Sequence, residues 1–345
     1  MIAIPQSATC RRAAIVVLLL TLTLRLYPQY QAGNAILAED QHKSLYPEMV
    51  RDYDVEYIAG GATQNSIRVA QWMLQTDTPS TAFIGCIGID DFGEQLEKAA
   101  RGDGVEALYL KDETTPTGTC AVLVHEAERS LVANLSAANA YKHAHAQTPE
   151  IQAAVARARV FYTAGFFLTV SPETMEMVGK HAAENNKVFC LNLSAPFLIQ
   201  FFSKQMDGVL PYTDFVFGNE DEAAAFGKHH GWTKEGEAAD LRAIALRLSA
   251  LPKASGARPR TVVFTQGSEK TLVAQNGTVR EFDVAKLRKE ALVDTNGAGD
   301  AFVGGFLSQL VQNRDISECV RAGHYAARIV IQRSGCSFPP QPDWA

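Results

Sequence analysis

The stretch DTNGAGDAFVGGFLSQL, from Asp294 to Leu310, combines a lone carboxylate with the start of an apolar helical pattern. The small residues 296–299 come directly before Asp300, and the apolar positions that follow recur every four residues, at Phe302, Phe306 and Leu310. This spacing predicts one buried helical face. A helix N-terminus exposes unpaired N–H groups and a partial positive charge, so it attracts anions. The pattern therefore predicts an anion site with a fixed acid beside it.

Such a site suits phosphoryl transfer, in which positioning and charge neutralisation carry most of the catalysis. Asp300 can take a proton from an attacking hydroxyl, while the amides of Gly297, Ala298 and Gly299 hold the charged group in transit. The sequence has no GxxxxGK[ST] and no GxGxxG spacing in this stretch, which argues against a P-loop kinase and a dinucleotide fingerprint. The alternative for an isolated GAGD is a helix cap whose small residues allow close packing.

Composition narrows the class of protein. A chain of 345 residues with 47% hydrophobic and 20% charged residues is typical of a globular enzyme with a large core, in one large α/β domain or two. The net charge of −6, without a block of Lys or Arg, argues against nucleic acid as a partner. The 6 cysteines lie far apart without a CxxC pair, which indicates reduced thiols.

The N-terminal segment 1–33 is unlike the rest of the chain. Two arginines precede an apolar run at 13–24, which is too short to span a bilayer comfortably but fits a signal-peptide core or a buried strand. No convincing small-x-small cleavage site follows it. We expect a cytoplasmic protein, with the nucleus as an alternative, and membrane contact only if the run acts as a signal.

From Thr81 onward, apolar runs alternate with helical patterns, as in a doubly wound α/β fold with a mainly parallel sheet and helices on both faces. Asn276-Gly277 between two alternating runs predicts a β-hairpin. Two more polar, strand-like segments, at about 34–60 and 115–137, predict a small β-sheet that covers the site as a lid.

Further motifs carry a family resemblance. DTNGAGDAFVGGF resembles the C-terminal signature of the ribokinase-like (PfkB) sugar and nucleoside kinases, GGATQNSIRVAQWM resembles their N-terminal glycine-rich signature, and GNEDE resembles their magnesium and phosphate motif. CIGIDDFGE, RSLVANLSAANAY, AGFFLTVSPE, NLSAPF, VFTQG, AGHYAA and GCSFPPQPD resemble the adenosine kinases of this family. The likeness begins at about residue 34, so it implies a ribokinase-like kinase domain at 34–345.

The resemblance implies transfer of the γ-phosphate of ATP to the 5′-hydroxyl of adenosine, giving ADP and AMP, as in purine salvage. Asp300 is then the base, and Gly297, Ala298 and Gly299 form the anion hole. Asn219 and Glu222 order Mg²⁺ through water. The substrate-binding positions that it implies are Gly61, Asn65, Leu37, Leu131, Leu135 and Phe167. The positions that it implies for the nucleotide side are Arg129, Asn219, Gln266, Gly267, Asn296, His324 and Phe338.

The chain departs from the family at its N-terminus. Adenosine kinases begin with a strand that carries an aspartate for the ribose hydroxyls, and segment 1–33 offers no equivalent. Loss of a charge-assisted hydrogen bond of this kind costs about 1.5–3 kcal/mol. Two alternatives therefore stay open: an impaired variant that binds nucleotide without efficient turnover, and a kinase for another nucleoside or a sugar. We expect adenosine and ATP as ligands, and a monomer.

Overall fold

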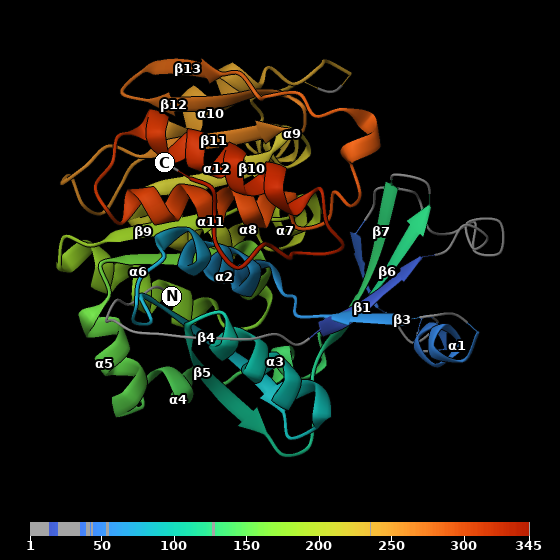
Figure 1. Cartoon of the computed structure of the whole chain (residues 1–345). Coiled ribbons are helices and arrows are strands. Elements are labelled where there is room, and N and C mark those ends of the chain that lie inside the picture. The colour runs from blue at the N-terminus through green and yellow to red at the C-terminus, as the bar shows by residue number, and fades with distance from the viewer. Residues whose placement is uncertain are drawn as a thin grey trace. The chain divides into compact units, whose positions relative to one another are not determined.

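The computed structural model describes residues 14–19, 35–38, 42, 44–52, 55–125, 128–234 and 236–344. These residues form two compact units (Figure 1). One unit is the continuous stretch Lys142–Lys286. The other combines the described residues up to Tyr141 with those from Leu287 onward.

The continuous unit is built on a six-stranded sheet in the order β13-β12-β11-β10-β9-β8. Its strands are β8 (Val160–Ala164), β9 (Val188–Asn192), β10 (Phe215–Asn219), β11 (Thr261–Gln266), β12 (Glu269–Gln275) and β13 (Thr278–Phe282). Strands β8 to β11 are parallel, and β12 and β13 join antiparallel. The predicted mainly parallel sheet is confirmed.

Helices alternate with these strands. They are α4 (His143–Ala146), α5 (Pro149–Arg157), α6 (Pro172–Glu184), α7 (Pro196–Phe201), α8 (Ser203–Val209), α9 (Glu220–His229) and α10 (Leu241–Ala250), with 3-10 turns η4 (Gly165–Thr169) and η5 (Leu210–Tyr212). Helix α6 packs on β8 and β9, and α10 packs on β11 and β12. Strands such as β10 are almost wholly buried, which explains their continuous apolar sequence.

The predicted hairpin is confirmed at β12 and β13. Asn276 and Gly277 have φ values of 52° and 73°, the left-handed pair that a two-residue type I′ turn requires. Gln275 then pairs with Thr278 across the turn.

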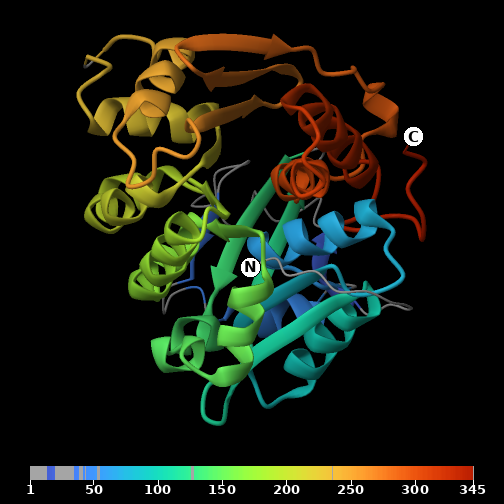
Figure 2. The same cartoon turned by 90° about the vertical axis from the view of Figure 1, so that its left-hand side faces the viewer.

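The second unit contains two smaller sheets. In one, β4 (Thr81–Gly88) pairs in parallel with β5 (Val105–Asp112), and α3 (Asp91–Gly102) connects them. Figure 2 shows the two strands side by side with α3 next to them. The alternation of strands and helices in the sequence predicts β4 as one more strand of the main sheet. Among the described residues it pairs only with β5.

The other small sheet has five strands in the order β2-β7-β6-β1-β3 (Figure 1). They are β1 (Ala14–Leu19), β2 (Ala35–Leu37), β3 (Val55–Ile58), β6 (Thr119–His125) and β7 (Glu128–Asn134), accompanied by α1 (Leu45–Asp52) and the 3-10 turn η3 (Ser136–Ala140). Four of these strands come from the segments expected to form the lid. The fifth, β1, comes from the apolar run and lies between β6 and β3. The rest of that run lies outside the described residues.

Three helices complete the second unit: α2 (Ala62–Leu74), α11 (Ala298–Leu310) and α12 (Ile316–Val330), with the 3-10 turn η6 (Lys289–Ala291) before α11. Helix α11 packs against both α2 and α12. Small residues bring the helices close, since a Cβ on Gly304 would lie 2.5 Å from the carbonyl oxygen of Ser66. This packing brings together the first turns of α2 and α11, where the predicted chemistry lies.

Candidate functional site

The first turn of α11 has the geometry predicted for an anion site. Gly297 is the N-cap residue with φ 77°, a left-handed conformation that favours glycine. Ala298, Gly299 and Asp300 follow as the first helical residues, where N–H groups have no partner four residues back. The amide of Ala298 donates to the carbonyl of Thr295 at 3.2 Å. A ligand that draws on this amide therefore competes with a turn hydrogen bond.

Asp300 is joined to the other end of the predicted site by one hydrogen bond. The Nδ2 of Asn65, in the first turn of α2, donates to Oδ2 of Asp300 at 2.9 Å. Asn65 is buried, and its Oδ1 has no hydrogen-bond partner among the described residues. A buried amide oxygen without a partner is costly, so it is a natural acceptor for a substrate hydroxyl.

The pKa of Asp300 is raised to about 6, because burial of the carboxyl disfavours its charged form more than the Asn65 hydrogen bond favours it. A carboxylate with this pKa is ionised at pH 7 yet more basic than an ordinary aspartate. That combination is what a general base for a hydroxyl proton requires.

The turn before α2 carries the residues predicted for the substrate side. Gly61 is the N-cap of α2 with φ 95°, again in the glycine-favouring region, and its carbonyl accepts from the amide of Asn65 at 2.8 Å. This bond fixes the backbone from which the Asn65 side chain extends. The neighbouring Gln64 is fully enclosed and accepts a hydrogen bond from the hydroxyl of Tyr109.

In the continuous unit, Asn219 and Glu222 form a reciprocal cap at the start of α9. The Asn219 Oδ1 accepts from the amide of Glu222 at 2.8 Å, and the Glu222 carboxylate accepts from the amide of Asn219 at 3.0 Å. This is a capping box, which stabilises the helix start independently of any metal. Burial nevertheless raises the pKa of Glu222 to about 7. A cation near this carboxyl would offset its buried charge.

Three other predicted residues also belong to the continuous unit. Gln266 ends β11, and its side-chain amide donates to the carbonyl of Lys270. Gly267 follows with φ 55° in the exposed turn before β12. Phe167 is half-buried in the turn η4, directly after β8. All three lie at or just beyond the carboxyl ends of parallel strands, where open α/β sheets bind ligands.

The remaining predictions fall in the second unit. Asn296 lies in the loop 293–299 that leads into α11, called the anion loop below, and its amide donates to Asp294 at 2.7 Å. His324 on α12 lies against the ring of Phe302, and burial lowers its pKa. Leu135 is half-buried at the start of η3. Three more predicted residues, Leu37, Arg129 and Leu131, have side chains outside the described part of the structure.

Phe338 occupies a packed position in the second unit. Its ring stacks on Trp72 with centroids 5.1 Å apart, and the guanidinium of Arg68 lies 5.5 Å from its centroid. These contacts give Phe338 a structural role in holding the C-terminal segment against α2. Its role on the nucleotide side stays a prediction.

Sequence reasoning missed two buried charged residues in this unit. Asp294, at the first position of the quoted stretch, is 1% exposed and accepts from the amides of both Asn296 and Gly335. Arg68 on α2 pairs with Asp103 at 2.6 Å. The sequence offered one signal for each residue, a charge inside an otherwise apolar or glycine-rich segment. This signal does not show which residue the charge pairs with.

Within the described part of the chain, no group of three or more His, Cys, Asp or Glu side chains is arranged to hold a metal ion.

Comparison with known proteins identifies the family. Residues 33–344 match the model of the pfkB family carbohydrate kinases. The chain belongs to the pfkB family. The predicted resemblance to ribokinase-like kinases, drawn from the two glycine-rich signatures, is thereby confirmed.

Relatives of known activity are similar over nearly the whole chain. The chain is 57% identical over 312 residues to adenosine kinase 1 of Arabidopsis thaliana, which covers 90% of this chain and 89% of the plant protein. Among solved structures, that of Anopheles gambiae adenosine kinase in complex with P1,P4-di(adenosine-5) tetraphosphate has a TM-score of 0.90 and 47% identity, covering 96% of this chain and 97% of the other. Adenosine kinase from Schistosoma mansoni in complex with 2-fluoroadenosine has a TM-score of 0.88 and 34% identity, covering 94% and 95%.

These comparisons confirm the predicted fold, the likeness to adenosine kinases and the class of enzyme, a phosphotransferase with a hydroxyl acceptor. Among the described helices, none is both long and apolar enough to cross a bilayer.

Proposed function

We propose that this chain transfers the γ-phosphoryl group of ATP to the 5′-hydroxyl of adenosine, yielding AMP and ADP. The observation that carries the proposal is the Asn65–Asp300 pair at 2.9 Å. It sets a basic carboxylate at the start of one helix beside a buried amide whose oxygen lacks a partner among the described residues. One group can deprotonate a hydroxyl while the other orients the same molecule.

The relatives support adenosine as the acceptor and ATP as the donor. The Anopheles enzyme was solved with a tetraphosphate that carries adenosine at both ends, and the Schistosoma enzyme with an adenosine analogue. The first ligand joins the two nucleosides of an acceptor and a donor in one molecule. At 57% identity to a plant adenosine kinase, this chain is expected to act on the same pair.

In the proposed mechanism, Asp300 removes the proton of the 5′-hydroxyl as the oxygen attacks the γ-phosphorus in line. The amides of Gly297, Ala298 and Gly299 receive the phosphoryl oxygens, whose charge is favoured at the positive end of α11. The side chain of Asn65 holds the nucleoside in place and keeps Asp300 ionised. Little reorganisation is needed, because both helix starts are already packed together.

Mg²⁺ is the expected metal of this reaction, where it neutralises the phosphate charge. The residues present fit a hydrated ion: Glu222 is a buried carboxyl whose pKa is raised to about 7, and a nearby cation would hold it ionised. Asn219 fixes its orientation through the capping box. We therefore propose that both residues order the waters of the ion.

We keep the predicted ligand roles of Phe167, Leu37, Leu131 and Leu135 for the purine, and of Arg129, Gln266, Gly267, His324 and Phe338 for the nucleotide. The five cysteines in the described part of the chain are free thiols, which supports the predicted cytoplasmic location. We also keep the predicted monomer as part of the proposal.

A phosphate-transfer assay with radiolabelled ATP tests the proposal. Adenosine is compared with inosine, guanosine and ribose as acceptors, and Asp300→Asn serves as the blank. We expect labelled AMP from the wild type and a rate at least about 100-fold lower from the variant. Equal rates for the two proteins would exclude Asp300 as the base. Preference for another acceptor would redirect the assignment, and adenosine binding without product would identify an impaired variant.

A further inference from the structure

The C-terminal segment Ile331–Phe338 is bound to the anion loop by backbone and side-chain hydrogen bonds. The amides of Val293 and Asp294 both donate to the carbonyl of Ile331, at 2.9 and 3.1 Å. In return, the Asp294 carboxylate accepts from the amide of Gly335 at 2.9 Å. Residues 293–294 and the segment 331–335 are therefore joined by hydrogen bonds at Ile331 and again at Gly335.

Asp294 also fixes the anion loop itself. Its second carboxylate oxygen accepts from the amide of Asn296 at 2.7 Å, one residue before Gly297. With 1% exposure, the carboxylate cannot obtain replacement hydrogen bonds from water. Because Asp294 ties Asn296 to Gly335, the loop cannot shift without breaking a buried charge-assisted bond.

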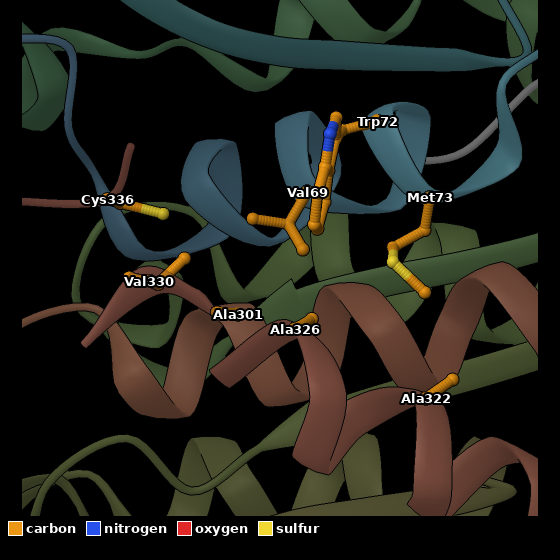
Figure 3. Packing of buried hydrophobic residues seen from close by; sticks show 8 residues of the cluster. All are labelled: Val69, Trp72, Met73, Ala301, Ala322, Ala326, Val330 and Cys336. Atoms are coloured by element: carbon orange, nitrogen blue, oxygen red, sulfur yellow. The ribbon is translucent and has the colours of Figure 1, made fainter. Parts of the chain in front are cut away.

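Cys336 continues this contact at the residue after Gly335. A Cβ on Gly297 would lie 3.1 Å from the Cβ of Cys336, so the C-terminal segment 331–338 (the tail) packs directly on the N-cap of α11. Burial raises the pKa of the Cys336 thiol to about 12, which keeps it neutral as a packing group. Cys336 lies in the same buried cluster as Val69 and Trp72 of α2 and Ala301 of α11 (Figure 3).

Arg68 connects the same tail to the substrate-side turn. Its Nη1 donates to the carbonyl of Ala59 at 2.9 Å and to that of Cys336 at 3.4 Å, while its Nε donates to Asp103 at 2.6 Å. Ala59 directly precedes the two glycines of the turn before α2. One buried guanidinium thus holds both the substrate-side turn and the tail that supports the anion loop.

We propose that Asp294 and Arg68 are positioning residues, which act through the segment 331–338 to fix the anion loop relative to the turn at 59–61. Neither residue needs to touch the substrate. The inference rests on the phosphoryl transfer proposed above, since its effect is on the alignment of that reaction. Misalignment of about 1 Å can cost a reaction of this kind roughly 100-fold.

The substitution Asp294→Asn tests this directly. The new amide keeps one acceptor oxygen but presents an NH₂ group to the second backbone N–H, so one of the two bonds is lost. We expect kcat to fall about 10- to 100-fold, with the KM for adenosine within about threefold of the wild type. All rates are taken at a temperature at which circular dichroism shows the protein to be folded.

Asp214→Asn is the matched control. Asp214 is also a buried aspartate, accepting from the amide of Phe189 at 3.0 Å and pairing with Lys253. It belongs to the continuous unit, whereas Asn65 and Asp300 belong to the other unit. Its substitution should lower Tm and leave kcat of the folded enzyme unchanged. If Asp294→Asn does not fold, Arg68→Lys carries the test, since lysine cannot serve Asp103 and both carbonyls together.

Each outcome decides the inference. A fall in kcat for Asp294→Asn or Arg68→Lys, absent in Asp214→Asn, supports it. Wild-type kcat in the folded variants, an equal fall in the control, or a change confined to the KM for adenosine overturns it. Wild-type enzyme that transfers no phosphate would instead refute the proposed function, so the two failures are distinguishable.

Discussion

The Nδ2 of Asn65 lies 2.9 Å from Oδ2 of Asp300, although 235 positions separate the two residues in the sequence. Each residue belongs to the first turn of its helix, α2 or α11. Their separation is therefore set by the packing of two helices and not by the conformation of a loop. Such a scaffold holds reacting groups more firmly than mobile segments do.

The first prediction concerns the dependence of the rate on pH. The pKa of Asp300 is raised to about 6 by burial, and the carboxylate must be ionised to act as a base. We expect kcat/KM for adenosine to be level above about pH 7 and to fall roughly tenfold per pH unit below pH 6. Steady-state assays from pH 5 to pH 8, with folding checked at each pH, measure this. A level profile down to pH 5 would contradict it.

The second prediction concerns Asn65→Ala. The Asn65 hydrogen bond lowers the pKa of Asp300, so its removal should raise this pKa and move the acid limb of the profile to higher pH. Loss of the proposed contact with the nucleoside should also weaken adenosine binding about tenfold, or about 1.4 kcal/mol. Ser66→Ala is the control, because within the described part of the chain the buried Ser66 hydroxyl bonds only to the carbonyl of Ala62. An unmoved limb in Asn65→Ala would show that Asp300 does not set the profile.

Local features of this fold were predictable from the sequence because they depend on short segments. Continuous apolar runs in the sequence predict the buried parallel strands. Asn276-Gly277 predicts its turn by the backbone conformation that these two residues favour. The glycine-rich start of α11 was predictable for the same reason. Its left-handed N-cap at Gly297 needs no distant partner.

Long-range pairings could not be predicted in this way. Nothing in the sequence of β4 shows which strand lies beside it, and nothing in the apolar run assigns β1 to the five-stranded sheet. Asp294 finds its second partner at Gly335, 41 residues later. Asn219 and Glu222 show the opposite case: their local spacing was noticed, but the same spacing serves a helix cap and a metal motif.

The third prediction concerns Glu222→Gln. Burial raises the folded-state pKa of Glu222 from 4.5 to about 7, so ionisation disfavours the folded state. The stability contributed by the neutral Glu222 carboxyl is fully present below pH 4.5 and is lost as pH rises through 7. Glutamine does not titrate and can still accept from the amide of Asn219. From pH 5 to pH 8, the free energy of unfolding of the wild type should therefore fall by about 2 kcal/mol relative to that of the variant, as measured by urea denaturation.

The same variant bears on magnesium. If Glu222 orders the waters of the ion, Glu222→Gln should require more Mg²⁺ for half-maximal rate, by about tenfold. Glu220→Gln is the matched control, since Glu220 is in the same helical turn but outside the capping box. Equal magnesium dependence in both variants would restrict Glu222 to its role as a cap.

The last prediction concerns Gly304→Ala on α11. A Cβ at this position would lie 2.5 Å from the Ser66 carbonyl oxygen and 2.6 Å from the Cβ of Val69, and these atoms of α2 cannot rotate away. The two helices must separate, which costs about 1–3 kcal/mol and lengthens the Asn65–Asp300 contact. We expect a lower Tm and a kcat reduced about tenfold in the folded protein. Gly208→Ala, where nothing lies within 4 Å of the new methyl group, should instead raise stability slightly. Full activity in folded Gly304→Ala would show that the spacing of α2 and α11 does not control the reaction.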